Sequence, residues 1–153
     1  VVEGARHAAG EVGLWPWPLG GAKGSTQELH HALSASATWR RLAGATSETP
    51  LPEDLRLALA GLAQTVGPEW EAVCADYARV VGCVQLLTDT ELFILHGPLT
   101  ELGARFCESI IEAARGLFPS LAAKPPKLVP SELGGDAGAL GAASLAMESW
   151  APA

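Results

Sequence analysis

A glycine-rich stretch near the end of the chain decides the expected fold: Pro126-Lys127-Leu128-Val129-Pro130-Ser131-Glu132-Leu133-Gly134-Gly135-Asp136-Ala137-Gly138-Ala139-Leu140-Gly141-Ala142-Ala143-Ser144-Leu145-Ala146-Met147. The short apolar run predicts a strand over residues 127–129, the paired glycines predict a tight turn, and Asp136 is placed to cap a helix. One face of that helix carries almost no side chain, because it consists of glycine and alanine. We therefore expect the helix to approach a sheet, or a ligand at its N-terminus, unusually closely.

The composition is that of one globular domain over residues 1–153, because 48% of the residues are hydrophobic and can form a sizeable core. No apolar run approaches the roughly 20 residues that cross a bilayer, so no membrane association is expected. Lys and Arg number ten, are scattered and leave a net charge of -7. This balance argues against nucleic-acid binding by these residues, since phosphate contacts need clustered cations.

Three cysteines indicate the cellular compartment of the protein, and the first residues bear on whether its N-terminus is complete. Cys74, Cys83 and Cys107 fall in apolar helical patterns, which predicts reduced thiols and a cytoplasmic protein without disulfides. Val1-Val2-Glu3 reads as a strand without a partner in this sequence, and no initiator methionine precedes it. We therefore expect the chain to be truncated at its N-terminus.

Apolar periodicity predicts a helix-rich α/β domain. Ser25 and Glu28 match a capping box, which predicts a helix from Thr26 to about Ala43. Further helices are expected over residues 53–66, 69–87 and 101–117, and a buried strand over residues 91–95. Residues 14–24 contain two prolines and three glycines, so an aromatic loop is expected there. The tail alternates helix and strand, which predicts parallel strands.

Three motifs occur in a characteristic order: Gly10-Glu11-Val12-Gly13, the strand and turn at residues 92–97, and the segment at residues 130–143. Together they resemble the C-terminal half of the ROK family, which contains bacterial sugar kinases and sugar-responsive transcriptional repressors. The resemblance covers essentially the whole chain, and its last motif is the most specific. It implies an actin/hexokinase-like ATPase fold (ribonuclease H-like), with a mixed sheet, packed helices and a sugar bound between two lobes.

The resemblance implies two sugar-binding glutamates. The family's glutamate in the glycine-bounded turn corresponds to Glu11, and a second glutamate that opens the next helix corresponds to Glu28. Carboxylates suit this role because two acceptor oxygens can bind vicinal hydroxyls. Each residue also has a simpler interpretation: Glu28 is explained as part of the capping box, and Glu11 could be a solvated turn residue.

The chain departs from the family where the family holds a structural zinc. Leu14 occupies the histidine position, and the following loop contains no cysteine. Trp15 and Trp17 could replace the metal by packing, or form a surface for a partner or a sugar. His30 and His31 are expected to point about 100° apart on a helix, so they are interpreted as solvated surface residues. No metal site is therefore assigned from the sequence.

Nucleotide contacts are the weakest implication of the resemblance. The family places a glycine-containing turn after the strand at residues 92–95, which corresponds to Gly97, and the later glycine pair offers Gly134. Pro98 follows Gly97, removes a backbone donor and stiffens the turn, which argues against close approach of a phosphate. ATP and Mg²⁺ are expected only if the protein is a kinase.

Two functions fit these observations. The first is the sugar-sensing domain of a transcriptional regulator that contacts DNA only through a helix-turn-helix module upstream. The second is an ATP-dependent sugar kinase whose catalytic aspartate and phosphate loop lie upstream. The missing zinc loop and the altered turn at Gly97 favour the regulator, and whether the protein is an enzyme stays open. A homodimer or tetramer is implied by the resemblance alone.

Overall fold

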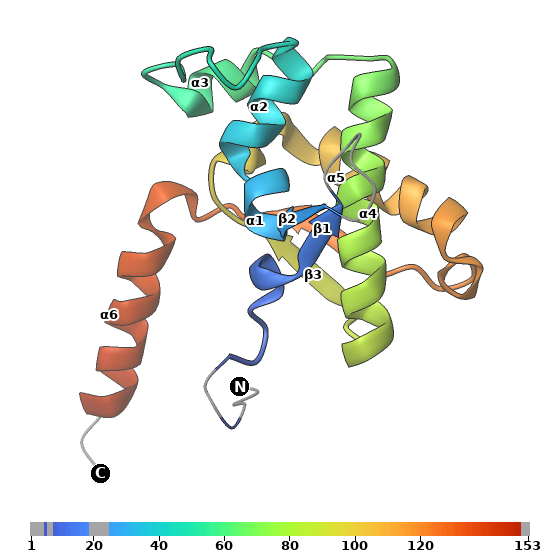
Figure 1. Cartoon of the computed structure of the whole chain (residues 1–153). Helices are drawn as coiled ribbons and strands as arrows, with labels where there is room; N and C mark the ends of the chain where they lie inside the picture. The colour runs from blue at the N-terminus through green and yellow to red at the C-terminus, as the bar shows by residue number, and fades with distance from the viewer. Residues whose placement is uncertain (1–4, 6–7, 19–24, 151–153) are drawn as a thin grey trace.

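A computed structural model describes residues 5, 8–18 and 25–150 of the chain (Figure 1). The expected strand at residues 1–3 lies outside the described residues. The strands are β1 (Pro16–Pro18), β2 (Thr26–Glu28), β3 (Leu92–Leu95) and β4 (Lys127–Pro130). The α-helices are α1 (Leu29–Ala32), α2 (Ala35–Ala43), α3 (Leu55–Ala60), α4 (Pro68–Thr88), α5 (Gly103–Leu117) and α6 (Ala137–Trp150). Short 3₁₀ turns are η1 (Val12–Leu14), η2 (Pro98–Leu102), η3 (Pro119–Leu121) and η4 (Gly134–Asp136).

The core lies between α4 and α5, whose apolar stripes were expected from their spacing. Trp70 and Tyr77 of α4 each meet the ring of Phe106 of α5 edge to face, with centroids 5.5 and 5.4 Å apart. Such pairs stabilise beyond their buried area. Arg105 of α5 covers Trp70, with its guanidinium carbon 4.4 Å from the ring centroid, and donates to the carbonyls of Ala63 and Thr65. The segment after α3 is thereby fixed to the two long helices.

The predicted parallel strands are confirmed, since β3 pairs with β4 in parallel and α5 forms the connection between them. Phe93, Leu95 and Leu128 pack on the core from one face of this sheet. The other face exposes Leu92, Ile94 and Val129. The expectation of a buried strand is thus met on one face only, although parallel sheets are usually covered on both.

The described strands form two separate two-stranded sheets rather than the single mixed sheet that was expected. The second sheet pairs β1 with β2 in antiparallel fashion, with Trp17 opposite Gln27. The expected aromatic loop therefore includes a short strand. Prolines at positions 16 and 18 are tolerated because the pair has only edge strands, where a missing backbone donor costs little.

The predicted helix from Thr26 to Ala43 is wrong at its start. Residues 26–28 are extended, and Glu28 precedes α1 without a side-chain capping bond. Ser34 is the residue that caps a helix here, because its hydroxyl accepts from the backbone nitrogen of Ala37 at the start of α2. The capping-box interpretation of Ser25 and Glu28 is therefore incorrect.

Two other predicted helices differ in length or packing. The helix expected over residues 53–66 ends at Ala60, before Gly61, and is capped by Asp54. The final helix forms directly after Asp136, as expected, but it does not pack closely. Within the described residues α6 buries no side chain, and Figure 1 shows it extending away from the other elements. The expectation of a tight approach to the sheet is wrong in this structure.

The length and hydropathy of the helices decide whether any of them could span a membrane. In the described part of the chain, every helix is too short or too polar to cross a bilayer.

Candidate functional site

Glu11 occupies an exposed turn beside the C-terminal end of α4. Gly10 adopts a φ of +90°, which favours glycine, and the backbone then enters η1 through a bond from Leu14 N to Glu11 O of 3.1 Å. Glu11 lines a cavity of about 210 Å³, which is closed on the other side by α4. The lining residues from α4 are Val84, Leu87 and Thr88. A carboxylate at the edge of a small, mostly apolar cavity can orient a polar ligand through its hydroxyls.

Glu28 is exposed at the junction of β2 and α1, and this junction packs against the turn that holds Glu11. Leu29, which is buried, anchors the junction by donating its backbone N–H to Trp15 O at 2.8 Å. The ring of His30 continues the contact, with Nδ1 lying 3.1 Å from the carbonyl oxygen of Gly13. The segments that carry Glu11 and Glu28 are thus neighbours, yet the cavity at Glu11 is not lined by Glu28.

The histidines beside Glu28 do not point apart as expected. Glu28 Oε2 lies 3.5 Å from His30 Nδ1 and 3.9 Å from His31 Nε2. The two imidazole rings tilt by 45° with centroids 3.9 Å apart. The expected divergence assumed a regular helix from residue 26, whereas α1 is a single turn that begins after an extended Glu28. His30 and His31 are exposed, as the interpretation as solvated surface residues requires, but the expected divergence of their side chains is wrong.

Trp17 lines a larger cavity, of about 920 Å³, between the β1–β2 sheet and α4. Its polar side is formed by Arg41 and Asp76, which pair at 2.8 Å, and by Arg79, which also pairs with Asp76. Two guanidinium groups on one carboxylate leave a positive balance at this wall. An aromatic ring opposite fixed donors and acceptors is an arrangement that can hold a polar ligand.

Gly97 and Gly134 follow the C-terminal ends of β3 and β4, the two paired strands of the parallel sheet. Gly97 lies two residues after the end of β3 with φ +96°, and Gly134 lies four residues after the end of β4 with φ +58°. Among the described residues, and apart from the chain neighbours of each glycine, no atom lies within 4 Å of a Cβ built on either one. The carboxyl edge of parallel strands is where open α/β sheets bind ligands, so backbone approach is sterically open there. The cavity at Glu11 includes neither glycine.

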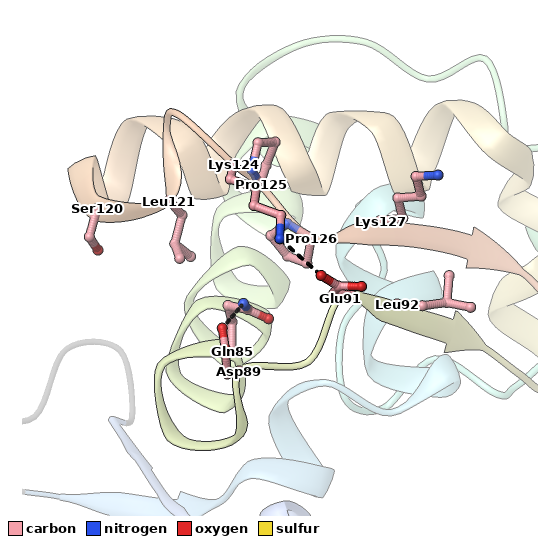
Figure 2. A pocket seen from close by; sticks show the side chains of 10 residues that line it. All are labelled: Gln85, Asp89, Glu91, Leu92, Ser120, Leu121, Lys124, Pro125, Pro126 and Lys127. Carbon is pink, nitrogen blue, oxygen red and sulfur yellow. Dashed lines mark hydrogen bonds and ion pairs between the residues drawn. The ribbon is translucent and has the colours of Figure 1, made fainter.

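A cavity of about 570 Å³ lies at the opposite edge of the same sheet, where β3 and β4 begin (Figure 2). Lys124 donates to Glu91 at 2.9 Å across its mouth, and this hydrogen bond lowers the pKa of the Glu91 carboxyl and raises that of Lys124. Both side chains are exposed, so the pair contributes little to stability. Sequence reasoning assigned no functional role to these residues.

Two buried thiols, those of Cys74 and Cys107, are not nucleophilic at neutral pH. Burial raises the pKa of Cys74 and of Cys107 from 9.0 to about 11. The nucleophilic species is the thiolate, so neither residue is a candidate nucleophile at neutral pH. The expectation of buried reduced thiols is confirmed for these two, while Cys83 is free and half-buried.

Comparison with known proteins gives no family or fold assignment. No protein-family model matches the chain, and neither a curated protein nor a solved structure is significantly similar to it.

Proposed function

We propose that this chain is the sugar-sensing lobe of a ROK-type transcriptional regulator, with an actin/hexokinase-like fold. The proposal places a sugar effector at Glu11 and Glu28, and contact with DNA in a helix-turn-helix module upstream. Such a regulator acts in the cytoplasm as a homodimer or tetramer. Resemblance of the three motifs to that family is the basis of this proposal.

The observation that carries the proposal is the placement of the two glutamates. Both carboxylates are exposed, both follow extended or glycine-bounded backbone, and the segments that hold them pack together through Gly13 and His30. The cavity beside Glu11 is smaller than the roughly 300–1,000 Å³ of sites for drug-sized ligands. A monosaccharide is a ligand of the right class for such a cavity, since its ring is compact and its hydroxyls donate to carboxylates.

A kinase is the second candidate, and the glycines at the carboxyl edge of the sheet favour it. Open backbone at Gly97 and Gly134 suits the approach of a nucleotide phosphate. Pro98 begins η2 directly after Gly97 and withholds one backbone donor from that edge, which weighs against the kinase. The sequence encoded upstream separates the two: a helix-turn-helix supports the regulator, and a kinase phosphate loop supports the enzyme.

Sugar binding is tested by calorimetry on the 153-residue chain with glucose, xylose, N-acetylglucosamine and N-acetylmannosamine. We expect one of these sugars to bind, and Glu11→Ala to weaken that binding about tenfold or more, the effect of losing roughly 1.4 kcal/mol. Glu53→Ala is the matched control, because Glu53 is an exposed carboxylate in the loop before α3. Equal affinity of the Glu11→Ala and Glu53→Ala variants would remove Glu11 from the site.

A further inference from the structure

Glu28, His30 and His31 form a cluster that the proposed sugar function leaves unexplained. Each of the three offers a ligand atom, and these atoms all lie within 4.8 Å of one another. Two ligand atoms on one tetrahedral zinc ion, each about 2.0–2.1 Å from it, are separated by roughly 3.3 Å. Glu28 Oε2 lies 3.9 Å from Nε2 of His31, which is close to that separation, and 3.5 Å from Nδ1 of His30, the ring nitrogen that faces Gly13. Rotation of these exposed side chains would bring one nitrogen of each ring and the carboxylate to the separation that a single ion requires.

The backbone around the cluster is fixed on three sides. Glu28 ends β2, where it pairs with Pro16, and Leu29 is buried behind the cluster. Leu29 N also donates to Trp15 O. The three side chains therefore project from a short, anchored segment, so little backbone order remains to be gained when an ion binds.

His30 makes the contact that commonly orients a metal-binding histidine. A carbonyl oxygen can only accept, so Nδ1 of His30 carries the proton in its 3.1 Å bond to Gly13 O. The lone pair of Nε2 is then free for an ion. Histidines that bind metals typically donate their other ring N–H to a backbone carbonyl or a carboxylate in this way.

The donor set selects the class of ion. Two imidazoles and one carboxylate suit a divalent ion of borderline softness, and Zn²⁺ is commonly held by these three groups with further positions left open. Mg²⁺ and Ca²⁺ prefer sites made entirely of oxygen. The side chains of His30, His31 and Glu28 are 49, 63 and 51% exposed, so water or an added ligand can complete the coordination.

We propose that Glu28, His30 and His31 form a zinc-class metal site at the junction of β2 and α1. The site does not depend on the proposed sugar function, although the two share Glu28. Metal titrations contain no sugar, so failure of either proposal can be recognised separately.

The test uses the 153-residue chain in a Cys83→Ser/His7→Ala background, which removes a half-buried thiol and a histidine outside the described residues as competing ligands. After treatment with a chelator, the protein is titrated calorimetrically with ZnCl₂, and with MgCl₂ as the comparison ion. We expect one equivalent of Zn²⁺ to bind saturably and Mg²⁺ not to compete. His31→Ala, His30→Ala and Glu28→Gln should each weaken Zn²⁺ binding about 10- to 100-fold, at least the loss seen when an outer partner of a metal ligand is removed.

His96→Ala is the matched control, because His96 is an exposed histidine at the end of β3 and lies outside the cluster. Its affinity for Zn²⁺ should equal that of the background protein, and circular dichroism should show that every variant folds. Co²⁺ provides a second readout, as visible absorption bands that the His30→Ala/His31→Ala double variant lacks. Absence of saturable Zn²⁺ binding, or unchanged binding in that double variant, overturns the proposal.

Discussion

Tyr77 joins α4 to the turn before α2 through its hydroxyl group. The hydroxyl donates to the carbonyl of Leu33 and lies 2.9 Å from the hydroxyl of Thr38, which is buried. Since a tyrosine has one hydroxyl proton, Thr38 is the donor of the second bond. The apolar stripe of α4 predicts that Tyr77 points inward, but the polar partners come from a segment 39 and 44 residues away.

Tyr77→Phe should lower the free energy of unfolding by about 1–3 kcal/mol, because it leaves Thr38 and the Leu33 carbonyl without a partner. Urea denaturation measures the loss. Thr38→Val removes only one of the two bonds, and the double variant should lose less than the sum of the two single variants. Strict additivity would mean that the two hydroxyl groups do not interact.

A buried tyrosine hydroxyl and two buried cysteine thiols make the stability of the protein sensitive to high pH. Burial raises the pKa of Tyr77 from 10.0 to about 12, and that of Cys74 and Cys107 from 9.0 to about 11. The unfolded chain therefore loses these protons at lower pH than the folded chain. Stability is complete below about pH 9 and falls as pH rises toward about 12, by up to about 1.4 kcal/mol per pH unit for each group.

Urea midpoints measured from pH 7 to pH 11 should show this fall. In Cys74→Ala/Cys107→Ala the slope between pH 9 and 11 should be shallower than in the wild type, whatever stability the double variant has at pH 7. A wild-type midpoint that stays constant up to pH 11 would contradict the role given to the thiols.

Gly82 of α4 lies so close to the ring of Phe118 that no larger residue fits at this position without a shift. It is buried within α4, and a Cβ at this position would lie only 2.2–2.7 Å from three ring carbons of Phe118, which follows α5. Helix propensity alone predicts that alanine stabilises a helix interior by about 1 kcal/mol relative to glycine. The steric conflict should reverse that sign.

We expect Gly82→Ala to destabilise the protein by about 1–3 kcal/mol, as overpacked cores do. Gly116→Ala is the matched control, because the space around Gly116 of α5 is open among the described residues, and it should be neutral or stabilising. Phe118→Ala should relieve the conflict, so that Gly82→Ala costs little in that background. Thermal unfolding of the wild type, the three single variants and the Gly82→Ala/Phe118→Ala double variant tests this, and a stabilised Gly82→Ala would show that the ring moves aside freely.

Elements with long periodic patterns could be predicted from the sequence, whereas the short ones could not. The helix predicted over residues 69–87 matches α4 to within one residue at each end, because its apolar spacing is repeated over five turns. β1 and β2 have only three residues each, and two residues of β1 are prolines. Their extended conformation is therefore decided by pairing between the strands and not by a local sequence pattern. The false capping box at Ser25 arose for this reason.

The candidate site was predictable in part for a related reason. The glycine-bounded turn marks Glu11 in the sequence, and the structure places it at a cavity. The cluster of His30 and His31 was missed because its geometry depends on where α1 begins. Its sequence signal, three potential ligands within four residues, is visible in Glu28-Leu29-His30-His31.

At the scale of the whole molecule, α6 and the open face of the parallel sheet are the parts that the core does not use. Leu140, Leu145 and Met147 of α6 are exposed, and no residue of this helix is buried among the described residues.

Deletion of the chain from Ala137 onward should therefore change the free energy of unfolding by no more than about 0.5 kcal/mol, as for surface changes in general. Deletion of α3 is the contrasting control, because it removes the fully buried Leu59 and should unfold the domain. Both truncations can be compared by urea denaturation followed by tryptophan fluorescence, with Trp150→Phe in the longer chain to match the signal. A loss of several kcal/mol on deleting α6 would mean that its apolar face packs on Leu92, Ile94 and Val129 in solution.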